Sequence, residues 1–403
     1  MSFFAEPKRS KVVKVRIAYA ASGRLRRQLM KICVRTTLLC ALAILPTALY
    51  AQTGVPRFEV DPYWPKPLPN NWMLGQVSGT AVDSDDHVWV LQRPRTLDEH
   101  DSYGESGSAD CCVPAPSVIE FDEAGNVVQA WGGPTTSAAR EGASATAYRW
   151  PDNEHGIFVD HNDNVWITGN GNDDAHILKF TSNGEFLLQI GEHGQSQGSN
   201  DTVNLGRPAG VVVHAPTNEV FVADGYANRR VIVFDADTGA YKRHWGAYGN
   251  RPDDSAPRTR TFEGPGSPQF NLVHGLGVSN DGLVYVGDRV NNRIQAFRID
   301  GTFVNEVYIA RKTSAREGTG FDVGFSADPE QRFFYVPDGS NKKVQIVERQ
   351  SMKLVGFFGG YGGHGVGEFY HIHSIATDSN GNVYLGEVNN GRRVLRWTHN
   401  GVN

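Results

Sequence analysis

The chain has 403 residues, with 39 Lys and Arg against 44 Asp and Glu, and therefore a formal net charge of −5. Residues 1–51 hold ten Lys or Arg and one Glu, so taking their net charge of +9 away from −5 leaves −14 on the rest. An acidic body of this size argues against nucleic acid and against an anionic membrane surface as the main partner.

The first segment, residues 1–51, is predicted to be a basic leader followed by a signal peptide. A basic stretch after Met30 precedes the apolar run Thr37–Leu45, and the small residue Ala51 precedes a polar one, which are the three parts of a secretory signal. The run is shorter than the roughly 20 residues that span a bilayer. We therefore expect cleavage after Ala51, no stable membrane anchor, and a periplasmic or secreted protein. Met1 and Met30 are both possible starts.

Residues 52–403 are predicted to form one all-β domain built from six repeats. Each repeat has a short apolar strand, a turn with Asp, Asn or Gly, a second strand rich in β-branched and aromatic residues, a polar turn and a third strand. The repeats start near Ser78, His155, Gly210, His274, Asp322 and His373. A repeat of roughly 40–50 residues with about four strands is typical of a propeller blade. The prediction is a six-bladed β-propeller.

Segments outside the repeats have two expected roles. Arg57–Met73 is expected to supply a strand that closes the ring against the last repeat. Three insertions rich in Gly, Pro and Ser are expected to form loops over one face. They are Thr96–Pro116, Thr135–Trp150 and Arg251–Pro268.

An Asp–Asn–Arg pattern follows the second strand in two repeats, at Asp224–Arg229 and Asp288–Arg293. This pattern is typical of NHL repeats. We expect the Asp and Arg side chains to tie neighbouring blades together.

Three histidines fall at one repeat position: His155, His274 and His373 start the second, fourth and sixth repeats. Alternate blades of a six-bladed ring are about 120° apart, so these imidazoles can converge on the axis. Three His ligands with an open position are the usual arrangement of catalytic Zn²⁺. Imidazole also suits Cu, Fe and Ni, so Zn²⁺ is the first choice and other transition metals stay open.

Several short motifs resemble the peptidyl-α-hydroxyglycine α-amidating lyase family over most of residues 52–403. The stretch Leu74–Gly79 resembles the family's entry into its first blade. Asp224-Gly225-Tyr226 resembles the segment that carries the family's catalytic tyrosine. The three repeat-start histidines match the family's zinc ligands.

The resemblance implies a carbon–nitrogen lyase acting on a small-molecule or peptide substrate. It implies that Tyr226 is the catalytic base and that Arg93 and Arg289 are active-site arginines. A metal at the histidines would acidify the hydroxyl of a carbinolamide, a tyrosinate would take the proton, and an amide and an aldehyde acid would result. The two arginines would favour the charged tyrosine and grip a carboxylate.

The chain departs from the family at two positions near the third histidine. Ser374 stands where the family has an Asp that helps to hold a structural Ca²⁺, so the case for Ca²⁺ is weak, although the backbone positions Val77 and Ile157 remain. His371 stands where the family has a methionine. It is a possible fourth ligand, an acid or base, or a plain polar substitution.

Adjacent cysteines, Cys111 and Cys112, lie in the first insertion. Export favours oxidation, so we expect a vicinal disulfide; a structural clip and a soft-metal thiolate pair are the alternatives. The other two cysteines, Cys33 and Cys40, belong to the leader.

Two other functions and the oligomeric state are left open by the sequence. A non-catalytic propeller would bind a protein or glycan through aromatic residues exposed in or near the insertions, with Tyr103, Trp150 and Tyr248 as candidates. A hydrolase of the sugar-lactonase type is less favoured, because its central ion is usually held by carboxylates and Asn. We expect a monomer.

Overall fold

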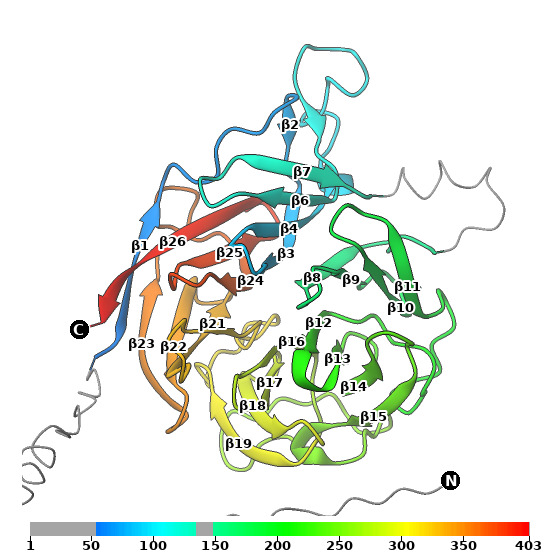
Figure 1. Cartoon of the computed structure of the whole chain (residues 1–403). Helices are drawn as coiled ribbons and strands as arrows, with labels where there is room; N and C mark the ends of the chain where they lie inside the picture. The colour runs from blue at the N-terminus through cyan, green and yellow to red at the C-terminus, as the bar shows by residue number, and fades with distance from the viewer. Residues whose placement is uncertain (1–53, 134–147, 403) are drawn as a thin grey trace, which may run out of the picture. The chain divides into compact units, whose positions relative to one another are not determined.

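The computed structural model describes residues 54–133 and 148–402. These residues form six four-stranded sheets arranged as blades around a central axis (Figure 1), which confirms the predicted six-bladed β-propeller. Neighbouring strands within every blade are antiparallel. The helical elements of the described residues are three short 3₁₀ turns, Pro94–Thr96, Ala215–Thr217 and Ala247–Gly249.

The blades follow one another in chain order, each from the centre outward. Blade 1 consists of β3 (Gln76–Val82), β4 (Val88–Arg93), β6 (Val118–Phe121) and β7 (Val127–Trp131). Blade 2 consists of β8 (Glu154–Val159), β9 (Val165–Gly169), β10 (His176–Phe180) and β11 (Phe186–Gly191). Blade 3 consists of β12 (Gly210–His214), β13 (Glu219–Asp224), β14 (Arg230–Asp235) and β15 (Tyr241–Trp245).

The second half of the ring repeats this order. Blade 4 consists of β16 (Val273–Val278), β17 (Leu283–Asp288), β18 (Arg293–Arg298) and β19 (Phe303–Tyr308). Blade 5 consists of β20 (Gly324–Phe325), β21 (Phe333–Asp338), β22 (Lys343–Glu348) and β23 (Lys353–Gly359). Blade 6 consists of β24 (Ile372–Thr377), β25 (Val383–Glu387), β26 (Arg393–Val402) and β1 (Pro56–Asp61).

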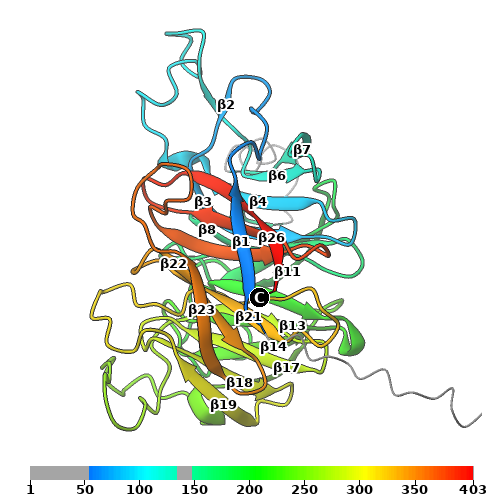
Figure 2. The same ribbon diagram turned by 90° about the vertical axis from the view of Figure 1, so that its left-hand side faces the viewer.

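Ring closure is made by strands from the two ends of the described chain. The N-terminal β1 pairs antiparallel with the C-terminal β26 (Figure 2), which confirms the closing strand predicted within Arg57–Met73. An ion pair between Arg396 and Asp61 spans the same junction. Further along the predicted segment, β2 (Trp72–Met73) pairs in parallel with β5 (Val113–Pro114) of the first insertion.

The hydrophobic core is divided among the interfaces between blades. Side chains of a strand alternate between its two faces, so one strand serves two interfaces. In β9, Val165 and Ile167 pack towards blade 1, whereas Trp166 packs towards blade 3. A fully buried apolar side chain stabilises the fold by about 1.5–3 kcal/mol. The alternation therefore makes every blade depend on both of its neighbours.

The Asp of the Asp–Asn–Arg pattern pairs with an arginine of its own blade. Asp288 accepts a hydrogen bond from Arg293 at 2.8 Å, and Asp224 is bound in the same way by Arg230 and not by Arg229. Arg230 also donates to the carbonyl of Asn204 at 2.8 Å. These guanidinium groups hold the segment that arrives from the preceding blade, because the hairpin after the second strand faces that segment.

Two of the three aromatic residues expected to be exposed are not. Trp150 is 3% exposed and packs between blades 1 and 2, where its Nε1 donates to Glu154 at 2.8 Å. Tyr248 is half-buried, and its hydroxyl accepts a hydrogen bond from Arg293 at 2.7 Å. Tyr103 is 39% exposed. Trp150 precedes β8 and Tyr248 follows β15, and both pack as extensions of these blades. The predicted binding surface formed by three exposed aromatic residues is therefore wrong.

The predicted signal peptide, with Cys33 and Cys40, lies outside the described residues, as does most of Thr135–Trp150. Within the described part of the chain, no helix has the length and apolar character needed to cross a bilayer.

Candidate metal centre

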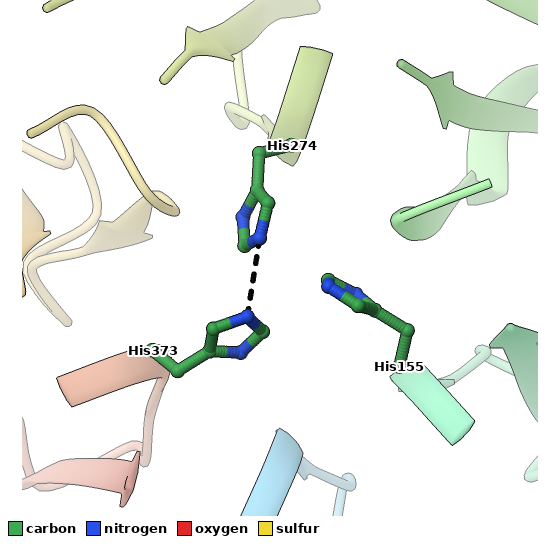
Figure 3. A group of neighbouring side chains, drawn as sticks. All are labelled: His155, His274 and His373. Carbon is green, nitrogen blue, oxygen red and sulfur yellow. Dashed lines mark hydrogen bonds between the residues drawn. The ribbon is translucent and has the colours of Figure 1, made fainter. Parts of the chain in front are cut away.

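The three repeat-start histidines meet at the centre of the ring. His155 comes from β8, His274 from β16 and His373 from β24, and their rings point towards one another (Figure 3). The ring centroids lie 4.7–4.8 Å apart, and Nε2 of His274 is 3.1 Å from Nε2 of His373. One nitrogen from each ring lies within 4.8 Å of the other two, so the group could hold a metal ion.

An irregularity in strand pairing accompanies each histidine. The register with the second strand shifts between Glu154 and Ile157, between Val273 and Leu276, and between Ile372 and Ser374. A β-bulge bends the strand and re-aims a side chain. Blade 1 shows the same shift between Val77 and Gly79, where Ser78 takes the place of a histidine, so the bulge is a shared feature of these inner strands.

The intervening blades orient the imidazoles. Nδ1 of His155 lies 2.7 Å from the carbonyl oxygen of Ala209, and Nδ1 of His274 lies 2.7 Å from that of Phe321. Nδ1 of His373 lies 2.8 Å from the carbonyl oxygen of Ser78. Each of these carbonyls belongs to the segment that begins the next blade. A hydrogen bond to Nδ1 fixes the tautomer and ring orientation of a metal-binding histidine.

Glycine allows this close approach after two of the histidines. A Cβ atom on Gly156 would lie 2.5 Å from the carbonyl oxygen of Ala209, and one on Gly275 would lie 2.7 Å from that of Phe321. These are the two carbonyls that His155 and His274 contact. The His-Gly sequence thus places the ligand and its orienting carbonyl together.

The positions of the ring protons leave Nε2 of each histidine free to bind a metal ion. A carbonyl oxygen only accepts hydrogen bonds, and a neutral imidazole has one N–H, so each ring carries its proton on Nδ1. No proton then lies between the Nε2 atoms of His274 and His373, and their lone pairs repel at 3.1 Å. Burial holds the pKa of all three histidines well below its usual value, and Arg289 acts in the same direction on each. Three neutral Nε2 donors are the ligand set that a divalent metal requires.

The predicted catalytic side chains lie at the same end of the ring as the histidines. Arg93 ends β4, Tyr226 follows β13 and Arg289 follows β17. The second strand of a blade runs antiparallel to the first, so its end lies beside the start of the first strand. The structure therefore brings all three residues to the edge of the histidine group.

Tyr226 is the residue in most direct contact with the group. Its hydroxyl lies 2.9 Å from Nε2 of His155 and accepts a hydrogen bond from Nη1 of Arg289 at 3.2 Å. Arg289 also donates to Glu317 at 2.8 Å. Arg93 is 8% exposed and donates through Nε to the carbonyl of Glu154 at 2.6 Å.

Arg207 is a site residue that sequence reasoning missed. Its guanidinium carbon lies 5.7 Å from the centre of the Tyr226 ring, and that of Arg289 lies 5.6 Å away. Arg207 stands in the loop before β12, outside the repeat pattern. Nothing in the spacing of strands identifies it.

His371 does not join the three histidines. Its ring packs against Phe321 at 5.6 Å between ring centres, and the Phe321 ring also contacts His274 at 5.5 Å. Burial, followed by the charge of Lys342, lowers the pKa of His371 to about 4. The imidazole is therefore neutral beside the site, and its role stays a prediction.

A cavity of about 420 Å³ continues along the axis and is lined by the six innermost strand segments. Ser374, in the place of the family's calcium-binding Asp, accepts a hydrogen bond from Thr80 at 3.2 Å. The carboxylate among the lining residues is Asp322 of blade 5, which accepts hydrogen bonds from the amides of Val323 and Ile375. Sequence reasoning placed Asp322 only as the start of a repeat.

Asp322 gives a pH-dependent prediction. Burial raises its pKa from 3.8 to about 7, so between these values the folded state keeps a proton that the unfolded state has released. Stability contributed by this group therefore falls as pH rises from about 4 to 7. Relative to Asp322→Asn, the metal-free protein should lose roughly 2–4 kcal/mol of unfolding free energy over that range. Urea unfolding at several pH values measures it. Asp85→Asn, at an exposed carboxylate, is the control. If the unaltered protein and Asp322→Asn give parallel profiles of unfolding free energy against pH, the raised pKa of Asp322 is refuted.

The cysteine pair lies between β4 and β5, directly before β5. The two sulfur atoms of Cys111 and Cys112 are in direct contact. Oxidation of this pair and its purpose stay predictions.

Comparisons with known proteins agree with this architecture. A family model described as NHL repeat matches residues 270–297, which cover most of the first three strands of blade 4. A streptogramin B lyase structure superposes with a TM-score of 0.51 and 12% identity, over 85% of this chain and 98% of the other, and supports the fold alone.

Two curated relatives carry names from peptide amidation. Peptidylglycine alpha-amidating monooxygenase of Rattus norvegicus is 26% identical over 324 residues, and the match covers 78% of this chain and 29% of the rat protein. Peptidyl-alpha-hydroxyglycine alpha-amidating lyase 1 of Drosophila melanogaster is 26% identical over 331 residues, or 71% of this chain and 57% of the fly protein. The chain thus spans less than a third of the rat relative and just over half of the fly relative. It is a six-bladed β-propeller with an NHL-repeat match in blade 4, and it resembles the peptidyl-α-hydroxyglycine α-amidating lyases.

Proposed function

We propose that this protein is a zinc-dependent lyase that breaks the C–N bond of an α-hydroxylated amide. The observation that carries the proposal is the contact between the histidine group and Tyr226. A hydroxyl 2.9 Å from one Nε2 atom is close enough to exchange a proton with a substrate placed at the three nitrogens. The name of the fly relative, an amidating lyase, supports the same reaction class.

The proposed roles follow from the positions of the side chains. His155, His274 and His373 would hold the ion through Nε2, and a bound Zn²⁺ supplies Lewis acidity towards the substrate's hydroxyl oxygen. Zn²⁺ is the first choice because three His ligands with an open position are its usual catalytic set.

Tyr226 acts as the base. It takes the proton of the substrate's hydroxyl, the oxygen electrons form a carbonyl, and the C–N bond breaks with its electron pair moving to nitrogen. Tyr226 then returns the proton to the nitrogen, so the products are an amide and an aldehyde acid. Arg289, which donates to the Tyr226 oxygen at 3.2 Å, stabilises negative charge on that oxygen. Arg93, buried beside Glu154, adds positive charge without donating to the tyrosine.

The test uses α-hydroxyhippurate, which such a lyase splits into benzamide and glyoxylate. Dialysis against a chelator is expected to abolish cleavage, and added Zn²⁺ is expected to restore it. Mg²⁺ is the control, because it prefers oxygen ligands. Full activity in protein shown to be metal-free would contradict the mechanism. If the protein binds zinc but the zinc-loaded form cleaves no α-hydroxyhippurate, the proposed substrate class is contradicted.

A further inference from the structure

Three guanidinium groups surround Tyr226 and His155, belonging to Arg93, Arg207 and Arg289. Those of Arg207 and Arg289 lie 5.7 and 5.6 Å from the centre of the tyrosine ring. Arg93 donates through Nε to the carbonyl of Glu154, the neighbour of His155, at 2.6 Å. The one carboxylate that pairs with any of the three arginines is Glu317, with Arg289, among the ion pairs of the described residues. Positive charge therefore exceeds negative charge beside the histidines.

The donors of two of these arginines are already engaged. Arg289 uses both terminal nitrogens, for Tyr226 and Glu317. Arg93 uses Nε and Nη1, for the carbonyl of Glu154 and the side chain of Gln76. Arg93 and Arg289 are also buried, at 8% and 6% exposure. Neither presents a free pair of nitrogens.

Arg207 differs in both respects. It is half-buried, and Nε donates to the carbonyl of Asn170 at 2.9 Å. Within residues 54–133 and 148–402, neither Nη1 nor Nη2 of Arg207 has a hydrogen-bond or ion-pair partner. The group is thus anchored by one nitrogen and keeps its two terminal nitrogens for a ligand. A planar fork of this kind matches the two oxygens of a carboxylate.

The backbone holds Arg207 in a defined position. Its φ is +62°, a left-handed conformation that non-glycine residues rarely adopt, and its amide donates to the carbonyl of Asp174 at 2.8 Å. The preceding Gly206 donates to Asp224 at 2.7 Å and accepts from Ala227, the neighbour of Tyr226, at 2.9 Å. Arg207 and Tyr226 are therefore fixed to each other. Strain of this kind persists where the surroundings impose it, often at binding sites.

We propose that Arg207 binds the carboxylate of the substrate with two parallel hydrogen bonds and so selects substrates that carry a free carboxylate beside the reacting carbon. This inference rests on the proposed lyase function, because it names the group by which that substrate is held. Arg207 is a specificity-determining residue that takes no proton. Its loss weakens binding and leaves the chemical step intact.

The experiment measures binding of hippurate, a stable analogue with a carboxylate, and of hippuramide, its uncharged counterpart. Calorimetry is performed on zinc-loaded protein carrying Arg207→Gln, Arg207→Lys or no substitution. Hydrogen bonds to charged groups contribute enough for Arg207→Gln to weaken hippurate binding about 10–100-fold, with hippuramide unaffected. Arg207→Lys should recover part of the affinity, because it keeps the charge and loses the fork. Arg298→Gln, at an exposed arginine on blade 4, is the control.

Kinetics separate this inference from the proposed function. With α-hydroxyhippurate, Arg207→Gln should raise KM about 10–100-fold and change kcat less than about threefold. If the unaltered protein binds hippurate through Arg207 yet cleaves nothing, the lyase proposal fails and the carboxylate site stands. Three results would each overturn the role of Arg207. Arg207→Gln could bind hippurate as tightly as the unaltered protein, or it could lose as much affinity for hippuramide as for hippurate. The third is that the unaltered protein does not bind hippurate.

Discussion

Replacing His274 by alanine is expected to lower the zinc content of the purified protein from about one ion per chain to near zero. The three Nε2 donors come from blades 2, 4 and 6, so no neighbouring side chain in the described group replaces a missing one. Loss of an outer-shell partner alone costs about 10–100-fold in metal affinity, and loss of a ligand should cost more. Elemental analysis after dialysis against a weak chelator measures the change.

Controls must separate metal loss from misfolding. His161→Ala, at an exposed histidine in the turn between β8 and β9, should keep the full zinc content. His155→Ala and His373→Ala should behave like His274→Ala, because each ring has the same carbonyl support. Circular dichroism establishes whether each variant is folded. A folded His274→Ala protein that retains one tightly bound zinc would mean that the ion sits elsewhere.

Replacing Tyr226 by phenylalanine is expected to lower kcat about 10²–10⁴-fold, the usual contribution of a positioned acid or base. The ring, which contacts the guanidinium groups of Arg207 and Arg289, remains in place, and the zinc content should not change. KM for α-hydroxyhippurate should stay within a few-fold, since the carboxylate contact is untouched. Steady-state kinetics of the zinc-loaded variant provide the measurement.

Tyr248→Phe is the matched control for this substitution. Tyr248 is also half-buried and hydrogen-bonded to an arginine, Arg293 at 2.7 Å, but it lies on the outer part of blades 3 and 4. Its loss should leave kcat unchanged. If Tyr226→Phe retains full turnover, the base is another group. If the unaltered protein binds ligands and turns over none, a non-catalytic propeller becomes the better account.

The architecture was predictable because it depends on periodic signals. A continuous run of β-branched and aromatic residues such as Val165, Trp166 and Ile167 identifies a strand that is buried on both faces. Six such strands at similar spacing leave few arrangements other than a ring. The register of His155, His274 and His373 within those repeats then predicts convergence, because equivalent positions in alternate blades face one point.

The details of the site were not predictable from the sequence. The register shifts beside the histidines depend on hydrogen bonding between strands, which residue types do not specify. Arg207 stands in a connecting loop whose path is set by Gly206 and Asp224, so its distance from Tyr226 has no periodic signal. The burial of Trp150 was missed because a Gly- and Ser-rich insertion precedes it and gives no sign of where the chain rejoins the blade.

Anomalous diffraction at the zinc edge, from crystals of unaltered protein grown with Zn²⁺, tests the shared metal site most directly. We predict one strong peak on the propeller axis, with the Nε2 atoms of His155, His274 and His373 each about 2.0–2.1 Å away. A peak bound to fewer than three of these nitrogens, or no peak at the axis while zinc occupies another cluster, would contradict the metal centre on which the proposed chemistry depends.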